Sequence, residues 1–272
     1  MEAKNSFKPI DIKAVFREKS PRLSRFVPGF VYRYLTRIMH IGELNEIISN
    51  YGHTEGAEFT GHVIKYFNVT QEVIGLENIP PEGRFIFASN HPLGGFDSLL
   101  LIENVYKKLG ELRFLVNDIL MKIFPLKSIF VPIDKYGATG REAAAQLRQV
   151  YESDMQILIF PSGLASRKIK GVVTDLEWKK HFIQKAIEYK RDVIPVHISG
   201  QNSNFFYRLA NLRKFLHIKW NLEIFFLSDE TFSHRNKHVV LKFGKPIPYS
   251  TFDKTKTTSD WANEVKKITY SL

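Results

Sequence analysis

The chain contains no cysteine, which excludes a disulfide scaffold, thiolate metal sites and cysteine nucleophiles. It also lacks a run of 18 apolar residues, because charged residues such as Arg33, Lys122 and Lys127 interrupt its most apolar stretches. A conventional transmembrane helix is therefore not predicted. The first residues lack the basic start, apolar segment and cleavage pattern of a signal peptide, so we expect no export by that route. Any membrane contact is expected to be peripheral or monotopic.

The chain also has fewer acidic than basic residues. Against 39 Lys and Arg stand 28 Asp and Glu, a net charge of +11, which favours an anionic partner such as nucleic acid, an acidic protein or a phospholipid surface. The basic residues are spread along all 272 positions, and no helix-turn-helix, zinc finger or aromatic-bearing sheet motif is present. The sequence thus predicts no nucleic-acid partner. At 44% hydrophobic residues it does predict a substantial folded core.

Two familiar catalytic patterns are also missing. The nine histidines show no His-Glu-x-x-His motif or other spacing typical of metal ligands, so we expect no metal site. No serine lies in a Gly-x-Ser-x-Gly elbow, which disfavours a covalent serine hydrolase.

An amphipathic helix is predicted between Phe26 and Ile41, where apolar residues recur at i and i+4 while Arg33 and Arg37 fall on the other face. Such a helix can lie in a lipid interface with its cations near anionic head groups, or it can pack on the domain with its arginines in solvent. We expect a membrane contact, through the residues Phe30, Val31, Tyr34, Leu35 and Ile38. A second amphipathic stretch, Glu58–Phe67, is expected to pair with it as an N-terminal helical hairpin within a membrane-association segment of residues 1–70.

From residue 71 to 272, short β-rich runs alternate with helical patterns. The expected strands are Glu72–Leu76, Arg84–Ser89, Arg113–Val116, Ile129–Ile133, Gln156–Phe160, Val193–Ser199, Leu222–Leu227 and His238–Phe243. The expected helices are Ser98–Leu109, Gly140–Ser153, Trp178–Tyr189, Phe205–Phe215 and Ser259–Ser271. This alternation predicts one α/β domain with a mostly parallel sheet flanked by helices.

The most informative stretch follows the expected strand that ends at Ser89. The chain passes directly into Asn90 and His91, then through a Pro-Leu-Gly-Gly turn to Asp97, where a helix is expected to begin. Open α/β folds bind ligands at the carboxyl ends of their strands, and a nearby carboxylate can fix the tautomer of an imidazole. His91 and Asp97 are therefore predicted to be a catalytic pair that removes a proton from a hydroxyl group. The alternative is that Asp97 only caps the helix.

The segment Asn90–Asp97 resembles motif I of the glycerolipid acyltransferase family, which includes the lysophosphatidic acid acyltransferases. Here five residues separate His91 from Asp97 instead of the usual four. This His-Pro-x-Gly-Gly-x-Asp variant resembles bacterial acyltransferases of aminolipid synthesis. Segments that resemble the later family motifs follow in the family's order: Ile129–Lys135, Phe160–Arg167, Val193–His197 and Gly244–Ile247. The third motif departs from the family pattern, because Ser162 stands where glutamate is usual and the arginine is displaced to Arg167.

The resemblance implies direct transfer of a fatty acyl group from a thioester, without a cofactor, to the hydroxyl of a lyso-lipid. His91 would act as general base with Asp97, and backbone N–H groups near Gly163 or Gly94–Gly95 would stabilise the oxyanion. The donor is left open between acyl carrier protein and coenzyme A, and the acceptor between lysophosphatidate and a lyso-aminolipid. The residues expected to bind substrate are Asn90, Gly94, Gly95, Lys135, Ser162, Gly163, Arg167 and Lys168.

Two further expectations complete the sequence-based hypothesis. The enzyme is expected at the cytoplasmic face of the membrane. Because Ser162 replaces the usual glutamate, a non-catalytic, membrane-docked lipid-binding protein of the same fold stays open as the alternative.

Overall fold

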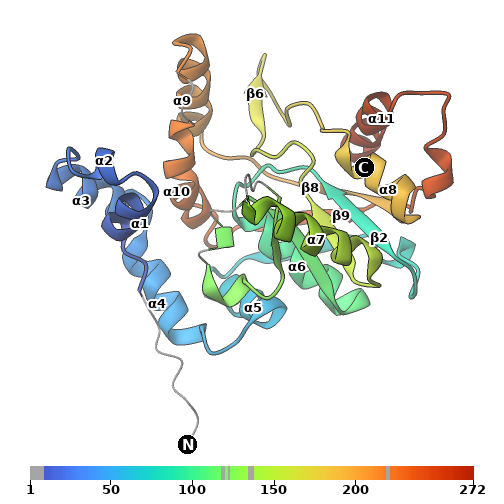
Figure 1. Cartoon of the computed structure of the whole chain (residues 1–272), viewed down its shortest axis with the longest axis horizontal. Coiled ribbons are helices and arrows are strands. Elements are labelled where there is room, and N and C mark those ends of the chain that lie inside the picture. Colours follow the sequence, from blue (N-terminus) through green and yellow to red (C-terminus); the bar gives the residue numbers. More distant parts are fainter. Residues whose placement is uncertain (1–8, 118–119, 122, 134–137, 219–220) are drawn as a thin grey trace, which may run out of the picture.

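The computed structural model describes residues 9–117, 120–121, 123–133, 138–218 and 221–272. Its centre is a seven-stranded sheet in the order β1-β9-β8-β2-β5-β3-β4, flanked by helices (Figure 1). All neighbouring pairs are parallel except β8 with β9. The predicted α/β fold with a mostly parallel sheet is confirmed. The strands are β1 (Thr70–Ile74), β2 (Phe85–Ser89), β3 (Leu112–Val116), β4 (Phe130–Pro132), β5 (Gln156–Ile159), β8 (Asp192–Ile198) and β9 (His238–Phe243).

The central strand β2 shows why the sheet is covered on both faces. All five of its residues are buried, and successive side chains point to opposite faces. Phe85 and Phe87 join the core beneath α5 and α6, while Ile86 and Ala88 join the core beneath α8 and α11. A strand buried on both faces lies in the middle of an α/β sandwich. The helices of the domain are α6 (Phe96–Leu109), α7 (Ala138–Glu152), α8 (His181–Tyr189), α9 (Asn204–Phe215), α10 (Leu227–Phe232) and α11 (Thr258–Ser271).

The N-terminal region differs from the predicted hairpin. The structure describes five helices before β1, which are α1 (Ile12–Lys19), α2 (Pro21–Ser24), α3 (Gly29–Ile38), α4 (Ile41–Tyr51) and α5 (Gly56–Tyr66). Helix α4, which was not predicted, lies between the two expected partners and contacts both. His40, with φ of 49°, reverses the chain between α3 and α4. Because α5 packs on α6 and buries Phe59 in the main core, the expected pairing of α3 with α5 is replaced by a chain of contacts from α3 to α4 to α5.

Two expectations for the second half of the chain need correction. Leu222–Leu227 was expected to be a strand, but it forms a 3-10 helix, η4 (Leu222–Phe226), followed by α10. A short apolar run does not by itself distinguish a strand from a buried helix. The antiparallel hairpin β6 (Arg167–Ile169) and β7 (Val172–Thr174) was not predicted. Its turn residues Lys170 and Gly171 both have positive φ, as a tight hairpin requires.

None of the described helices combines the length and the apolar composition that crossing a bilayer requires.

Candidate active site

His91 is held at the carboxyl end of β2 by backbone contacts on two sides. The backbone N–H of Asn90 donates to the carbonyl of Val196 in β8, at 3.4 Å. The carbonyl of His91 accepts from the backbone N–H of Ser166, at 2.7 Å. The residue that sequence reasoning singled out therefore lies at the edge of the sheet where parallel strands end, between the loops that follow β5 and β8.

The structure brings His91 and Asp97 together. His91 Nδ1 lies 2.9 Å from Asp97 Oδ2, and the carboxylate is fully buried. The backbone N–H of Leu93 donates to the same oxygen at 3.0 Å, and that of Ser98 donates to Oδ1 at 3.1 Å. Asp97 lies in the first turn of α6, where the helix dipole favours a negative charge. This environment keeps Asp97 as an acceptor, so Nδ1 carries the proton and Nε2 is left as the basic atom of the ring.

The alternative interpretation of Asp97 as a helix cap does not describe its position. The N-cap of α6 is Gly95, and the carboxylate lies two residues later. The Gly94–Gly95 turn lets it reach back to the imidazole across the five intervening residues, because Gly94 has φ of 74°.

An aromatic ring forms one wall of the site. The ring of Phe160, at the end of β5, stacks on the imidazole with 3.9 Å between centroids and 13° between planes. The side chain of His91 stays 15% exposed. The stacked ring fixes the imidazole plane while one part of it remains accessible.

Asp175 is a site residue that sequence reasoning missed. Its Oδ1 accepts from the backbone N–H of His91 at 3.2 Å and from the hydroxyl of Ser166 at 2.5 Å. Its Oδ2 accepts from the indole N–H of Trp178 at 2.8 Å. The buried carboxylate thus ties the loop after β2 to the loop after β5. No sequence signal marks it, because Asp175 lies 84 residues from His91.

Another histidine, His234, lies behind the His91 loop and, unlike His91, is buried. His234 is 2% exposed and packs near Phe96, with 6.4 Å between ring centroids. Burial lowers the pKa of His234 to about 4, and the charge of Lys237 acts in the same direction. This ring is therefore neutral at physiological pH and lies against the backbone of Leu93 in that loop.

Asn90 is placed differently from the expectation that it binds substrate. Its amide nitrogen donates to the carbonyl of Ile198 at 2.9 Å, and its amide oxygen accepts from the backbone N–H of Ile198 at 2.7 Å. The side chain is buried and mimics a strand partner for β8. Asn90 therefore positions His91 relative to β8.

In the loop after β5, Ser162 and Gly163, which were expected to bind substrate, make hydrogen bonds within the loop itself. The Ser162 hydroxyl donates to the carbonyl of Leu164 at 2.8 Å, and the backbone N–H of Gly163 donates to Phe160 at 2.9 Å. Gly163 has φ of 68°, and a Cβ at this position would lie 3.2 Å from the amine of Lys179. This turn is closed by its own hydrogen bonds.

Arg167 is turned into the protein. It is 6% exposed, its guanidinium pairs with Glu223 at 2.8 Å, and it donates to the carbonyl of Ala165 at 2.6 Å. Arg213 also pairs with Glu223 at 2.8 Å. Burial lowers the pKa of Arg167 from its ordinary value, which Glu223 opposes. The expected contact of Arg167 with an acceptor head group conflicts with this buried pairing.

The other predicted cations lie in two places. The Lys168 amine contacts the side-chain oxygen of Asn204 at 3.0 Å, between β6 and the start of α9. Lys135 lies outside the described residues.

The predicted membrane residues of α3 divide into two groups. Phe30 is 64% exposed and Tyr34 is 53% exposed, whereas Leu35 is buried. Val31 and Ile38 pack against the same small cluster as Leu35. Part of the apolar face that was expected to contact lipid therefore packs against the protein and holds α3 in place. Only Phe30 and Tyr34 of this face remain exposed.

Within the described ranges, no three His, Asp or Glu side chains gather in a way that could hold a metal ion.

Comparison with known proteins identifies a family and several relatives of this chain. The family model described as acyltransferase matches residues 14–272. The lyso-glycine lipid O-acyltransferase of Bacteroides thetaiotaomicron is 43% identical over 266 residues, which cover 97% of each chain. The protein of the same name from Phocaeicola vulgatus is 42% identical over 264 residues, covering 97% of this chain and 95% of the relative.

Among solved structures, the 1-acyl-sn-glycerophosphate acyltransferase PlsC from Thermotoga maritima is 21% identical, with a TM-score of 0.47 over 88% of this chain and 90% of that chain. The family model and the two curated relatives each span nearly the whole chain. They confirm the resemblance seen around His91, and this chain belongs to the acyltransferase family and is an acyltransferase enzyme.

Proposed function

We propose that this enzyme transfers a fatty acyl group from an acyl thioester to the hydroxyl of a lyso-aminolipid, with a lyso-glycine lipid as the first choice of acceptor. The observation that carries the proposal is the hydrogen bond between His91 and the buried carboxylate of Asp97, at the carboxyl edge of the sheet. The names of the two relatives that are more than 40% identical support the acceptor class.

The chemistry follows from this pair. Nε2 of His91 takes the proton of the acceptor hydroxyl while the oxygen attacks the thioester carbonyl carbon, and the resulting imidazolium is stabilised by Asp97. The tetrahedral intermediate then collapses, the carbon–sulfur bond breaks, and the imidazolium returns its proton to the leaving thiolate. An ester and a free thiol are the products, and no acyl-enzyme forms.

The oxyanion needs hydrogen-bond donors. Two loops are candidates for these donors, and the N–H of Gly163 already donates to the carbonyl of Phe160. This favours the Gly94–Gly95 turn, which lies between the two catalytic side chains in the sequence and carries no side chain to block close approach.

The environment of the third motif supports an amino-acid head group over a phosphate. Arg167, the arginine that would bind a phosphate with two prongs, pairs with Glu223 in the interior. Lys168, in β6, is exposed in part, and the Lys179 amine lies near Gly163. A single carboxylate needs fewer cations than a phosphate dianion. The ammonium group of either Lys168 or Lys179 would suffice to bind it.

We further propose that the enzyme works at the cytoplasmic face of a phospholipid membrane as a peripheral protein. Its net charge of +11 suits both the acidic acyl carrier protein and the phosphates of coenzyme A as donors. A direct comparison of the two thioesters decides between them.

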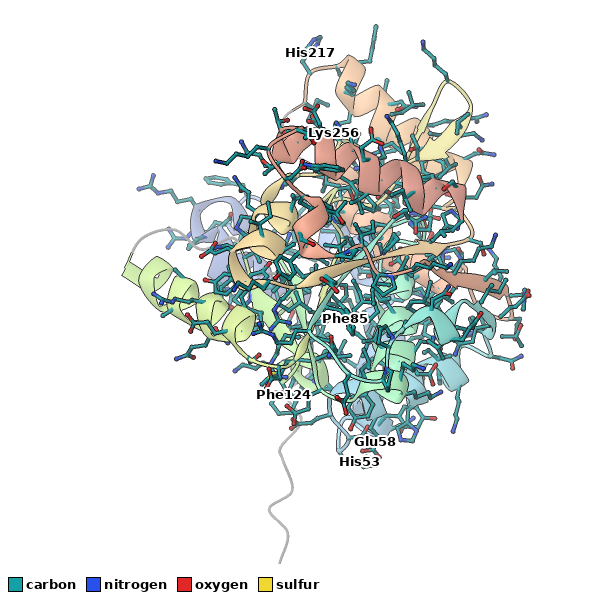
Figure 2. All side chains as sticks on the ribbon, turned by 90° about the vertical axis from the view of Figure 1, so that its right-hand side faces the viewer. His53, Glu58, Phe85, Phe124, His217 and Lys256 are labelled. Atoms are coloured by element: carbon teal, nitrogen blue, oxygen red, sulfur yellow. The ribbon has the colours of Figure 1, made fainter. Side chains whose placement is uncertain are left out.

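The test is acyl transfer by purified protein in detergent micelles, with labelled acyl-carrier protein or acyl-coenzyme A, and with lyso-glycine lipid or lysophosphatidate. We expect product with the lyso-glycine lipid and a loss of about 10³-fold in turnover for His91→Ala, within the usual range for a general base. His53→Ala is the matched control, because His53 is exposed between α4 and α5, at the lower edge of the molecule in Figure 2.

Full turnover by His91→Ala would contradict the general-base mechanism. Product from lysophosphatidate alone would correct the acceptor. Bound lyso-lipid without product in any arm would favour the lipid-binding protein of the same fold.

A further inference from the structure

Two segments project from the catalytic edge beyond the sheet. The hairpin β6–β7 begins next to Ser166, whose N–H binds the His91 carbonyl, and α9 follows the end of β8. Both stand out from the body of the protein at the top of Figure 1. The Lys168 amine contacts the Asn204 side chain at 3.0 Å, and Asn211 donates to the Lys168 carbonyl at 3.3 Å. These contacts join them into one unit, here named the α9 platform (residues 167–174 and 204–218).

The outer face of the α9 platform is apolar. Helix α9 buries Phe206, Tyr207 and Ala210 against the protein, and its opposite face repeats apolar residues at helical spacing. The exposed fractions are 54% for Phe205, 53% for Leu212, 77% for Phe215, 54% for Leu216, 64% for Val172 and 46% for Ile169. Single exposed apolar residues are ordinary, but a concentration of this kind marks an interaction surface.

The same unit carries positive charge only. No Asp or Glu occurs between residues 162 and 174 or between 201 and 218. Arg167 and Arg213 are used by Glu223. The remaining cations of the platform lie on its surface, and three of them line a depression between the hairpin and α9. These remaining cations are Lys168, Lys170, Arg208 and Lys214.

We propose that the α9 platform docks the enzyme on the surface of an anionic phospholipid bilayer. Aromatic and aliphatic side chains between cations are typical of interfacial membrane contacts, where the former enter the acyl boundary and the latter meet the head groups. An acidic protein would need the cations but not a Phe215 that is 77% exposed. Charge and apolarity together favour lipid.

This placement has a consequence for the active site. The platform directly follows the loops that contact His91, so docking brings the edge of the sheet that carries His91 toward the lipid surface. Figure 2 shows His217, just beyond α9, at the extreme of the molecule, far from Phe85 in the core. The proposal does not depend on the acceptor or donor, because binding to vesicles is measured without turnover.

The test is sedimentation of the full-length protein with vesicles of phosphatidylcholine containing phosphatidylglycerol. We expect the double variant Phe215→Glu with Leu216→Glu to lower the partition coefficient at least tenfold. The matched control is Tyr106→Glu with Ile268→Glu, exposed by 50% and 41% on other helices, which should bind like the wild type. In detergent micelles the Phe215/Leu216 variant should keep wild-type turnover, which separates this proposal from the proposed function.

A second variant set tests the charge. Neutralising Lys170, Arg208 and Lys214 to Gln should lower binding to the anionic vesicles at least tenfold and leave binding to pure phosphatidylcholine unchanged. These side chains are exposed, so folding is not at risk.

Three results would overturn the proposal. One is wild-type sedimentation by both platform variants. Another is loss of binding only in Phe30→Glu with Tyr34→Glu, which would assign the contact to α3. The third is normal vesicle binding with weakened binding of acyl carrier protein, which would make the surface a site for an acidic protein.

Discussion

Two loops leave the same edge of the sheet, and both resemble substrate-handling motifs, yet they use their polar residues in opposite ways. The loop after β2 directs His91 and Asp97 toward each other beside the accessible edge. The loop after β5 directs its arginine, Arg167, away from that edge and into a buried pair with Glu223. The first loop therefore keeps its polar pair at this edge, whereas the second loop commits its arginine to the interior.

The difference follows from the sequence distance between partners. His91 and Asp97 are six residues apart, so a turn alone brings them together. Arg167 and Glu223 are 56 residues apart, and they lie together because α9 packs against both β6 and η4. Local pairs are visible in a sequence, whereas distant pairs are decided by the fold.

The largest effect is expected from Asp97→Asn. The amide would present a donor or a weaker acceptor to Nδ1 and disturb the tautomer that leaves Nε2 basic, so we expect turnover to fall about 10³-fold. Asp175→Asn serves as the comparison, because Asp175 contacts the backbone of His91 and not its ring. Steady-state rates in micelles should show a clearly smaller loss, about tenfold, for Asp175→Asn. Equal losses would mean that the ring contact has no special role.

Arg167→Met tests the loop after β5. Removing one member of a buried ion pair is strongly destabilising, and we expect a loss of about 3 kcal/mol in the free energy of unfolding. Lys168→Met, at a half-buried neighbouring position, should change it by less than about 0.5 kcal/mol. Chemical denaturation measures both. A raised KM for the acceptor with unchanged stability would show instead that Arg167 binds substrate.

The pH dependence of the free energy of unfolding tests the surroundings of the loop after β2, because His234 is buried behind that loop. The pKa of His234 is lowered by burial to about 4, against 6.5 in the exposed state. Above about 6.5 both states are neutral and the stability is full. As the pH falls from about 6.5 to about 4, only the unfolded state gains the proton, so about 3 kcal/mol of stability is lost.

Denaturation between pH 7 and 4 checks this expectation. His234→Gln should remove most of the slope, and His53→Gln, at an exposed position, should retain it. A slope that persists in His234→Gln would assign the acid sensitivity to other groups.

The smallest effect compares one glycine from each loop. Gly94 and Gly163 both have positive φ, so alanine is strained at either position, by about 1–2 kcal/mol. A Cβ at Gly94 would lie 2.8 Å from Leu227 Cδ2, whereas at Gly163 it would meet the movable end of Lys179 at 3.2 Å. Gly94→Ala should therefore be more destabilising by about 1 kcal/mol. Thermal unfolding of both variants, and of Gly94→Ala with Leu227→Ala, checks whether relief of the contact removes the difference.

Much of the fold was predictable because its signals are local. Seven of the eight expected strands, among them the buried run Phe85–Ser89, coincide with strands of the sheet. The eighth, Leu222–Leu227, failed because a run with five apolar residues in six fits a buried helical turn equally well. Helix α4 was missed because the reversal at His40 depends on an unusual backbone conformation that histidine rarely marks.

The site divides in the same way. His91, Asp97 and the Gly94–Gly95 turn were predicted from one continuous segment. Asp175 was not, since it reaches His91 from a distant loop. The expectation for Leu35 was wrong for a related reason: an apolar stripe shows that a helix face is buried, and the sequence does not say against what.

The sequence by itself determined the alternation of strands and helices, the acidic partner of His91, and the excess of positive charge. Each of these follows from residues within a few positions of one another or from composition. Only the tertiary structure decided that Arg167 is neutralised by Glu223, that Asn90 braces β8, and that α9 and the β6–β7 hairpin share one exposed basic and apolar surface. These depend on contacts between distant segments, whose geometry is fixed only when the whole core packs.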